Sequence, residues 1–469
     1  TVVYSGIINN LDTSDVYRFS VTDLDFGFIS VPRTVNITLS GMSGDLDIRL
    51  IKDANSNGIV DSGDVLTSSS YGSNTAEWMS RTLGTGNYFL QVNQFGSANS
   101  NYHLSVSTGD WYSSNLSDAG IIGEARYADY YGGISRNDMI NILREAKDGG
   151  SISGTELTDL RTLLSGKGSI MPESVRVLSN KLLNGDLANG RSGIGNLFSG
   201  SSATQMENLI GKWFLGTDRP DASGTYRYAS GSLFQGGISY TDIDQGSVGD
   251  CYFLAALGST AYQSPSMIQN MFTDNGDGTF TVRFFNNGVA DYVTVDRYLP
   301  TTAGGNRVYA GWGGGSYTET NNELWVALAE KAYAQVNESG WLGRSVSENS
   351  YTSIGWGNGG NAMREITGQT TQGRGIPTDW WAGDLIERVV LINSLNAGAK
   401  ITMGTLDFDL ADSRVVADHE YSLVGYNSTT GRFKLFNPWG TDSGAANPGI
   451  LELTWDEIQA NFGYWSRTV

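Results

Sequence analysis

The chain has 469 residues, of which 39% are hydrophobic and 11% aromatic, so it can fold into about two to four globular domains. Its formal net charge of −19 argues against nucleic acid as a partner, because phosphate binding needs a cationic face, and suits calcium instead. No apolar run approaches the roughly 20 residues of a membrane span, and the single cysteine excludes an intramolecular disulfide.

The glycine content indicates a protein with many turns. There are 61 glycines against 8 prolines, with many Ser, Thr and Asn, as is typical of secreted bacterial proteins rich in β structure. The start of the chain, TVVYSGIINN, lacks the basic and apolar regions of a signal peptide, so a processed secreted chain and a trimmed piece both fit. We expect a secreted or cell-surface bacterial protein.

The segment 1–110 predicts a β-sandwich. Apolar and polar residues alternate in DVYRFSV, VNITLSG and LDIRLIK, which is the period of a strand with one buried face. Strands are expected at residues 16–20, 35–39, 46–51, 88–92 and 102–107. With GNYFLQV near its end, this segment resembles the bacterial pre-peptidase C-terminal domain, a β-sandwich appended to secreted proteases.

One loop of the predicted sandwich, DANSNGIVDSGD, follows the spacing of a calcium loop. In that pattern alternate side chains point oxygen atoms inward, and a glycine, here Gly58, allows a sharp turn. The alternative is a solvated polar turn between two strands. We favour calcium, with these ligands: Asp53, Asn55, Asn57, Asp61 and Asp64.

The segment 111–230 predicts a helical linker domain or pro-region. Apolar residues recur at helical spacing in two stripes, one at residues 139, 142, 143 and 146 and one at residues 157, 160, 163 and 164. The intervening loop EAKDGGSISGTE has only a partial calcium-loop pattern, and we interpret it as a calcium-free turn. Gly- and Ser-rich loops, including residues 190–202, are candidate nicking sites.

The only cysteine of the chain, Cys251, begins an apolar helical pattern in TDIDQGSVGDCYFLAA. A thiol at a helix N-terminus lies near unpaired N–H groups and the positive end of the dipole, which favour a thiolate. Nucleophilic catalysis requires such a group. The alternative is a small buried core residue.

A cysteine nucleophile needs a base and a group that orients the base. The chain has two histidines; His103 lies in the predicted sandwich, which leaves His419 as the candidate base. His419 and Asn437 fall on two strand patterns joined by a turn at residues 427–431, so the amide oxygen of Asn437 can accept a hydrogen bond from the imidazole. The NH₂ group of Gln245 can join the backbone N–H of Cys251 in an oxyanion hole. Purely structural roles are the alternative for each of these residues.

Several collinear segments together carry a family resemblance: TDIDQGSVGDCYFLAA, NELWVALAEKAYAQVN, DHEYSLVGY, LFNPWG and TWDEIQANF. They resemble the calpain family of cysteine proteases. The resemblance implies a multidomain chain in which residues 231–469 form an α+β, papain-like protease core with a Cys251, His419 and Asn437 triad. It also implies that Trp439 covers the contact between His419 and Asn437.

The same resemblance implies calcium in the core. The matching ligand positions are Asp242 and Glu323, completed by backbone carbonyls near Gln235 and Gly237. The segment after NPWG is less acidic than the family pattern and offers only Asp442 as a ligand for a second ion.

The sequence therefore predicts a calcium-dependent cysteine endopeptidase that acts on proteins, with its own linker as a further candidate substrate. One rival is a transglutaminase, which uses a similar Cys–His pair, but the GDC and NPWG segments fit it poorly. The other rival is a catalytically idle, calcium-binding adhesion or interaction protein.

Overall fold

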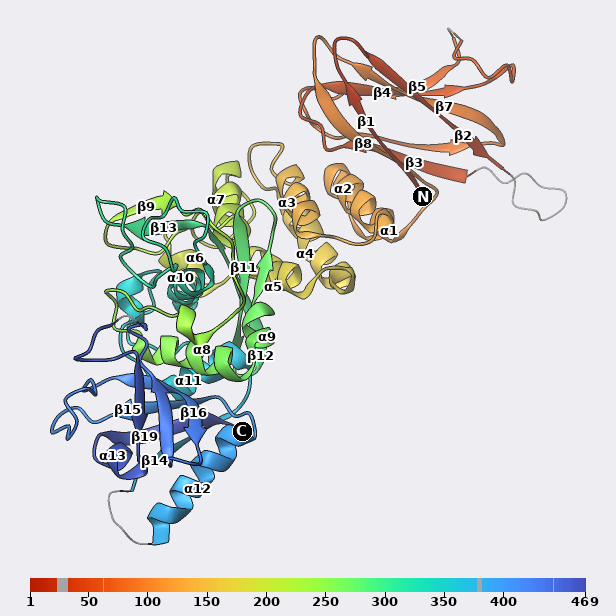
Figure 1. Cartoon of the computed structure of the whole chain (residues 1–469). Helices are drawn as coiled ribbons and strands as arrows, with labels where there is room; N and C mark the ends of the chain where they lie inside the picture. Colours follow the sequence, from red (N-terminus) through yellow and green to blue (C-terminus); the bar gives the residue numbers. More distant parts are fainter. Residues whose placement is uncertain (23–32, 62, 378–381, 442) are drawn as a thin grey trace. The chain divides into compact units, whose positions relative to one another are not determined.

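The computed structural model describes residues 1–22, 33–61, 63–377, 382–441 and 443–469 (Figure 1). These residues form two compact units. The N-terminal unit comprises Thr1–Asn189 with Ile194–Gly211, and the C-terminal unit comprises Gly190–Gly193 with Lys212–Val469. The sandwich and most of the helical segment thus lie in one unit, whereas the sequence predicts them as separate domains with boundaries at residues 110 and 230.

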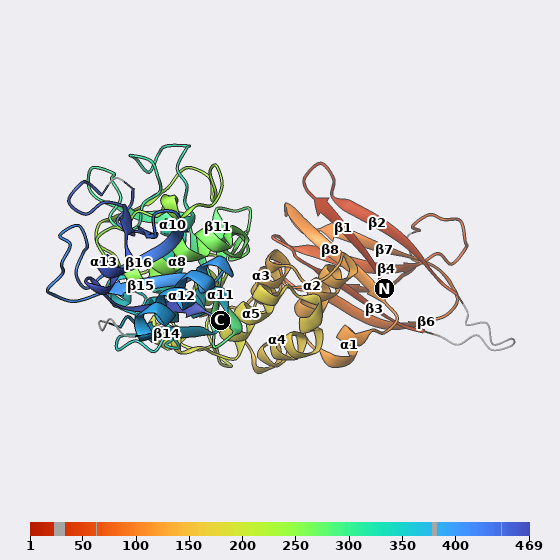
Figure 2. The same ribbon diagram turned by 60° about the horizontal axis from the view of Figure 1, so that its bottom comes forward.

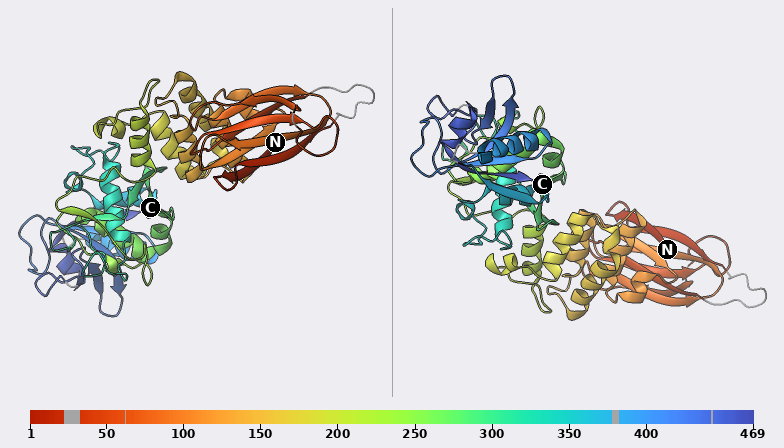
Figure 3. Two further views of the ribbon diagram at one scale, coloured as in Figure 1. Left: turned by 90° about the horizontal axis from the view of Figure 1, so that it is seen from above. Right: turned by 90° about the horizontal axis from the view of Figure 1, so that it is seen from below.

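The sandwich of the N-terminal unit consists of two four-stranded antiparallel sheets that face each other (Figure 3). One has the order β1-β8-β3-β6 and the other β2-β7-β4-β5. Their bounds are β1 (Val2–Ile8), β2 (Ser14–Val21), β3 (Arg33–Ser40), β4 (Leu46–Lys52), β5 (Val65–Ser69), β6 (Glu77–Leu83), β7 (Gly86–Gln94) and β8 (Ser100–Ser107). Each strand predicted from the sequence lies within an observed strand.

Three observed strands, β1, β5 and β6, are absent from the sequence prediction. In β5, Val65 and Leu66 are consecutive and both exposed, so no alternation marks the strand. Its pairing with β4 also contains a register shift. The strand forms because a neighbouring strand offers hydrogen bonds, which a local pattern does not reveal.

The helices of the N-terminal unit begin with well-formed caps. Ser135 and Ser153 form capping boxes with Asp138 and Glu156 at the starts of α3 and α4. The Glu156 carboxylate is thus used by a helix cap. The helices are α1 (Trp111–Asn115), α2 (Ala119–Tyr130), α3 (Arg136–Glu145), α4 (Gly154–Lys167), α5 (Glu173–Leu183) and α7 (Ala203–Trp213), whose last two residues belong to the C-terminal unit, and α6 (Leu187–Arg191) spans the boundary between the units.

Helix α2 packs against the sheet that contains β3 and β8 through buried polar contacts. Glu124 accepts hydrogen bonds from Ser40 Oγ at 2.9 Å and lies 2.7 Å from His103 Nδ1. Arg126 is paired with Asp110 at 2.7 Å. His103 therefore serves the packing of the N-terminal unit.

The C-terminal unit is built around α8 (Cys251–Gln263), which is labelled in Figure 2. Most residues of this helix are buried. Helix α8 packs against α11 (Gly359–Thr367) and against strand β16 (Glu420–Asn427). At the second contact, Ser422 Oγ donates a hydrogen bond to the Ala255 carbonyl at 2.7 Å. The helix that begins with the cysteine is thereby fixed beside the strand that follows the histidine.

Strand β16 belongs to a six-stranded antiparallel sheet with the order β14-β19-β15-β16-β17-β18. Its hydrophobic core includes Met403, Leu423, Leu435 and Trp465. The other strands of this sheet are β14 (Thr371–Gly375), β15 (Ile401–Thr405), β17 (Arg432–Phe436), β18 (Ile450–Leu453) and β19 (Phe462–Thr468). The remaining elements are α9 (Pro265–Gln269), α10 (Trp325–Asn337), α12 (Ala382–Asn396), α13 (Trp455–Gln459), β9 (Thr225–Tyr228), β10 (Phe272–Asp274), β11 (Thr279–Asn286), β12 (Val289–Asp296) and β13 (Tyr298–Thr301).

Candidate active site

Cys251 is the first residue of α8, and its thiol reaches the start of β16. The backbone N–H groups of Glu420 and Tyr252 hydrogen-bond to the sulfur. Burial raises the pKa of the thiol to about 12, and the neighbouring Asp250 and Glu420 carboxyl groups act in the same direction. Burial therefore opposes the thiolate that the position at the helix N-terminus is predicted to favour.

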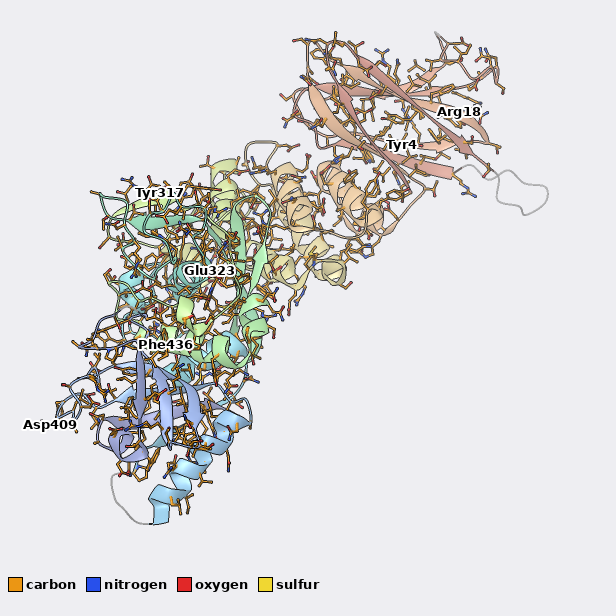
Figure 4. The ribbon with its side chains drawn as sticks, viewed as in Figure 1. Tyr4, Arg18, Tyr317, Glu323, Asp409 and Phe436 are labelled. Atoms are coloured by element: carbon orange, nitrogen blue, oxygen red, sulfur yellow. The ribbon has the colours of Figure 1, made fainter. Side chains whose placement is uncertain are left out.

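His419 and Asn437 lie at the open end of one hairpin. His419 directly precedes β16, and Asn437 directly follows β17 and Phe436, which is labelled in Figure 4. Strands β16 and β17 pair antiparallel, with Ser422 opposite Phe436. The His419 Nε2 and Asn437 Oδ1 atoms are 2.8 Å apart and both residues are buried. The predicted hairpin thus places the two side chains in hydrogen-bond contact.

The contacts of Asn437 determine which imidazole nitrogen carries the proton. The backbone N–H of Trp439 donates to Asn437 Oδ1 at 3.1 Å, so the atom facing it must be the amide oxygen. His419 Nε2 faces the same oxygen and must donate, which leaves Nδ1 as an acceptor. Burial lowers the pKa of His419 to about 4, so the imidazole is neutral at pH 7. It has the tautomer of a general base.

Trp439 lies over the histidine. The centroids of the His419 and Trp439 rings are 5.3 Å apart with an interplanar angle of 58°. The indole is 38% exposed, so it stands between the imidazole and solvent. This position agrees with the predicted cover over the hydrogen bond between His419 and Asn437.

Gln245 lies in the loop that leads to the cysteine, but its amide points inward. Its Nε2 donates to the Val248 carbonyl at 2.8 Å, and its Oε1 is buried without a hydrogen-bond partner. The backbone N–H of Gln245 donates to the Pro438 carbonyl at 2.8 Å, which joins this loop to the NPWG segment. In this arrangement the predicted oxyanion donor is held by its own loop.

Trp356 is a residue beside the site that the sequence analysis missed. The backbone N–H of Trp356 donates to the Gly249 carbonyl at 2.8 Å, and the Trp356 carbonyl accepts a hydrogen bond from Arg344 Nη1 at 2.7 Å. Its φ of 67° is left-handed, and its indole is 68% exposed. A tryptophan inside the glycine-rich run GWGNGG was the available signal, because glycine is the usual residue at such a backbone position.

The chain was then compared with known proteins. The family described as calpain family cysteine protease matches residues 219–461, which is just over half of the chain. The chain belongs to the calpain family of cysteine proteases. The match includes every residue of the core site described above, from Gln245 to Trp439.

Curated calpains match about half of the chain. Calpain clp-4 of Caenorhabditis elegans is 28% identical over 255 residues, covering 49% of this chain and 32% of that protein. Calpain-13 of Rattus norvegicus is 30% identical over 239 residues, covering 48% and 33%. The chain spans about a third of the length of these two relatives.

Among solved structures, the pre-peptidase C-terminal domain of a collagenase from Bacillus anthracis covers 23% of this chain and 88% of its own length. The identity is 17% and the TM-score 0.18. The resemblance of the N-terminal sandwich to that domain stays a prediction. Within the described ranges, no helix is long and apolar enough to cross a membrane.

The calcium positions that the calpain resemblance implies lie close together. Asp242 Oδ2 accepts hydrogen bonds from Ser239 N at 2.7 Å and Trp325 Nε1 at 3.1 Å. Glu323, labelled in Figure 4, accepts from Gln235 N at 2.7 Å. Burial raises the pKa of Glu323 to about 7, and the negative charge of Asp242 adds to the shift. A bound cation would relieve this repulsion, so the two carboxylates fit calcium.

The other predicted metal positions are less complete. Nowhere in the described ranges do three or more His, Cys, Asp or Glu side chains gather as a metal-binding group. A calcium ion at Asp242 and Glu323 would therefore need backbone carbonyls. Asp442, the predicted ligand of a second core ion, lies outside the described residues.

The loop from Asp53 to Asp64 is closed by its own side chains. Both Asn55 Nδ2 and Asn57 Nδ2 donate to Asp61 Oδ2, at 2.8 and 2.9 Å. Asp53 is 4% exposed; its Oδ2 accepts from Gly58 N at 3.1 Å, while its Oδ1 is buried without a hydrogen-bond partner. The sharp turn predicted at Gly58 is present, with a φ of 77°.

Proposed function

We propose that this chain is a cysteine endopeptidase that hydrolyses peptide bonds in proteins, with Cys251 as nucleophile, His419 as base and Asn437 as the group that orients the base. The hydrogen bond between His419 Nε2 and Asn437 Oδ1 is the observation that carries the proposal. This hydrogen bond leaves Nδ1 of His419 free to accept the thiol proton. The Cys251 sulfur lies beside the backbone of Glu420, the residue that follows His419.

The reaction begins with a neutral pair, because the pKa of the thiol is about 12 and that of the imidazole about 4. His419 Nδ1 takes the thiol proton as the Cys251 sulfur attacks the peptide carbonyl carbon. The imidazolium then protonates the leaving amine, and a thioester remains. A water molecule deprotonated by His419 hydrolyses the thioester and restores the thiol.

The role of Gln245 as an oxyanion donor requires one local change. Its NH₂ group must leave the Val248 carbonyl and turn toward the substrate oxygen. Removing one donor from an oxyanion hole costs about 3 kcal/mol of transition-state stabilisation. The loop of residues 245–250 therefore controls part of the catalytic power.

Covalent labelling distinguishes this function from an idle binding protein. An epoxysuccinyl inhibitor of papain-like proteases is expected to modify Cys251, because the thiol of an active site reacts when the base accepts its proton. Peptide mapping by mass spectrometry locates the adduct, with His419→Ala as the control that should react slowly. A protein that neither takes the label nor cleaves casein would be the adhesion or interaction protein of the alternative.

We further propose that calcium binds at Asp242 and Glu323 in the core and at the loop of Asp53 in the sandwich. In the core its charge would offset the two carboxylates and hold the loop before Cys251 against the start of α10. The Gly/Ser-rich segment 190–202 is a candidate site of self-cleavage, because loops of this composition are preferred sites of proteolysis. The composition of the chain makes a secreted or cell-surface location the expected setting.

Calorimetric titration of the full-length Cys251→Ala protein with calcium tests both sites. We expect two binding events; Asp53→Ala should remove one and Asp242→Asn the other, because each deletes a carboxylate ligand. Asp456→Asn, an exposed carboxylate on α13, is the matched control and should leave both events. Full proteolytic activity of the wild type in chelator would contradict calcium dependence.

A further inference from the structure

Two buried carboxyl groups lie directly behind the nucleophile. Asp250, the residue before Cys251, and Glu330, in the middle of α10, are both 0% exposed. Their side chains hydrogen-bond to each other. Two carboxylates can only accept hydrogen bonds, so such a contact requires that at least one of them carries a proton.

The contacts of the remaining oxygens support a shared proton. Glu330 Oε2 accepts from the backbone N–H of Ala310 at 2.9 Å, and Asp250 Oδ1 lies 3.4 Å from Gln245 Nε2. The other oxygens, Asp250 Oδ2 and Glu330 Oε1, are buried and have no donor from any other described residue. A proton between them satisfies both.

The position of Asp250 argues against a purely local role. Asp250 is the N-cap residue of α8, where an aspartate normally accepts a hydrogen bond from the first turn of its helix. Here its side chain makes no such cap. The carboxyl group is turned toward α10 instead, so it connects the Gln245 loop and the start of α8 to another helix.

We propose that Asp250 and Glu330 share a proton, and that this proton positions the turn bearing Cys251 and limits the negative charge beside the thiol. The proposal deepens the proposed function, since it assigns positioning residues to the same nucleophile. A second negative charge at this place would oppose thiolate formation, because like charges in a buried site repel strongly.

The surrounding charges do not remove the need for the proton. Among the described residues neither carboxyl group forms an ion pair. The Arg344 guanidinium is bound to Tyr252, Tyr333 and the Trp356 carbonyl, and that of Arg307 to Asp244 and backbone carbonyls. The titratable groups that face the pair are Arg344, Arg307, Cys251, Tyr252 and Tyr351.

Asp250 should titrate in a pH range where His419 and Cys251 do not. Glu323 also titrates near pH 7, so the Asp250 variant is needed to assign the step. Burial raises the pKa of Asp250 to about 7 and that of Glu330 well above its usual range. The raised folded-state pKa values mean that the native state holds more protons than the unfolded state, so the pair's contribution to stability falls as pH rises. His419 and Cys251, at about 4 and about 12, do not titrate near pH 7.

The test is the rate at which iodoacetamide alkylates Cys251 in the full chain, measured from about pH 5 to about pH 8. The alkylation rate of Cys251 is expected to rise steadily with pH. In the wild type this rise should be interrupted by a step near pH 7. Asp250→Asn should remove the step, because it deletes the carboxyl group that titrates there. Asp250→Asn should react about tenfold faster than the wild type above pH 7, the effect of one pKa unit on the thiol.

Glu365→Gln is the matched control. Glu365 is also a buried carboxyl with a pKa raised by burial, but it accepts a hydrogen bond from Tyr333 and should leave the wild-type curve unchanged. A wild-type curve without a step overturns the proposal even if the variants do not fold, and so does a step that persists near pH 7 in Asp250→Asn. Alkylation needs no peptide hydrolysis, so failure of the protease function would appear separately, in the casein assay.

Discussion

Replacing Cys251 with alanine is expected to abolish casein hydrolysis, with a loss on the order of 10⁶-fold in kcat, as when the nucleophile of a serine protease is removed. The loss is this large because no other described side chain at the site can form the acyl intermediate: the cysteine is the only one in the chain. The same substitution should also stop any self-cleavage of the Gly/Ser-rich segment, seen as a constant band pattern on incubation with calcium.

Ser259→Ala is the matched control for this result. Ser259 lies in the same helix, is fully buried, and uses its hydroxyl only for a bond of 3.1 Å to the Ala256 carbonyl. Its removal should change stability by about 1 kcal/mol and leave hydrolysis intact. Casein cleavage retained by Cys251→Ala would refute the assignment of the nucleophile.

Replacing Lys331 with methionine is expected to destabilise the C-terminal unit by about 1–3 kcal/mol, because buried acceptors lose a donor while Arg219 still pairs with Asp296 at 2.7 Å. Lys331 is 0% exposed in α10, and its ammonium donates to Asp296 Oδ1 at 2.5 Å and to the carbonyls of Asp296 and Tyr298, both at 2.7 Å. Methionine fills a similar volume but leaves the Asp296 charge and two carbonyl groups without this donor. Urea unfolding followed by tryptophan fluorescence measures the change.

Arg414→Met is the matched control for Lys331. Arg414 is paired with Asp412 at 2.6 Å, but its side chain is 47% exposed. Water screens such a pair, so its loss should cost about 0–1 kcal/mol. Equal losses for the two variants would mean that the buried ion pair of Lys331 contributes no more than a surface pair.

Local patterns were sufficient for the regular parts of the fold. The strands at residues 35–39 and 46–51 were predictable because apolar and polar residues alternate along them with a period of two, even though Thr38 on the polar face of β3 is also buried. The helices α3 and α4 were predictable from apolar stripes at helical spacing. Strand β5 was not, since its side chains are mostly exposed and only its pairing with β4 defines it.

The catalytic residues were accessible to sequence reasoning because each belongs to a distinct motif. One cysteine, one histidine outside the sandwich and an Asn–Pro–Trp segment leave few alternatives. Their contact was predictable from a hairpin, in which residues before one strand and after the next meet at the same end. The protonation states were not, because they depend on burial by elements far away in the chain.

The sequence by itself thus indicated the alternating strands, the apolar helix stripes, the family and the proposed nucleophile and base, because these depend on residue type and short spacing. Only the tertiary structure decided that burial raises the pKa of the thiol, that the Gln245 amide faces its own loop and that Trp356 stands exposed beside Gly249. It also decided that Asp250 meets Glu330 instead of capping its helix. Desolvation and contacts between distant segments cause all of these features, and neither leaves a local pattern in the chain.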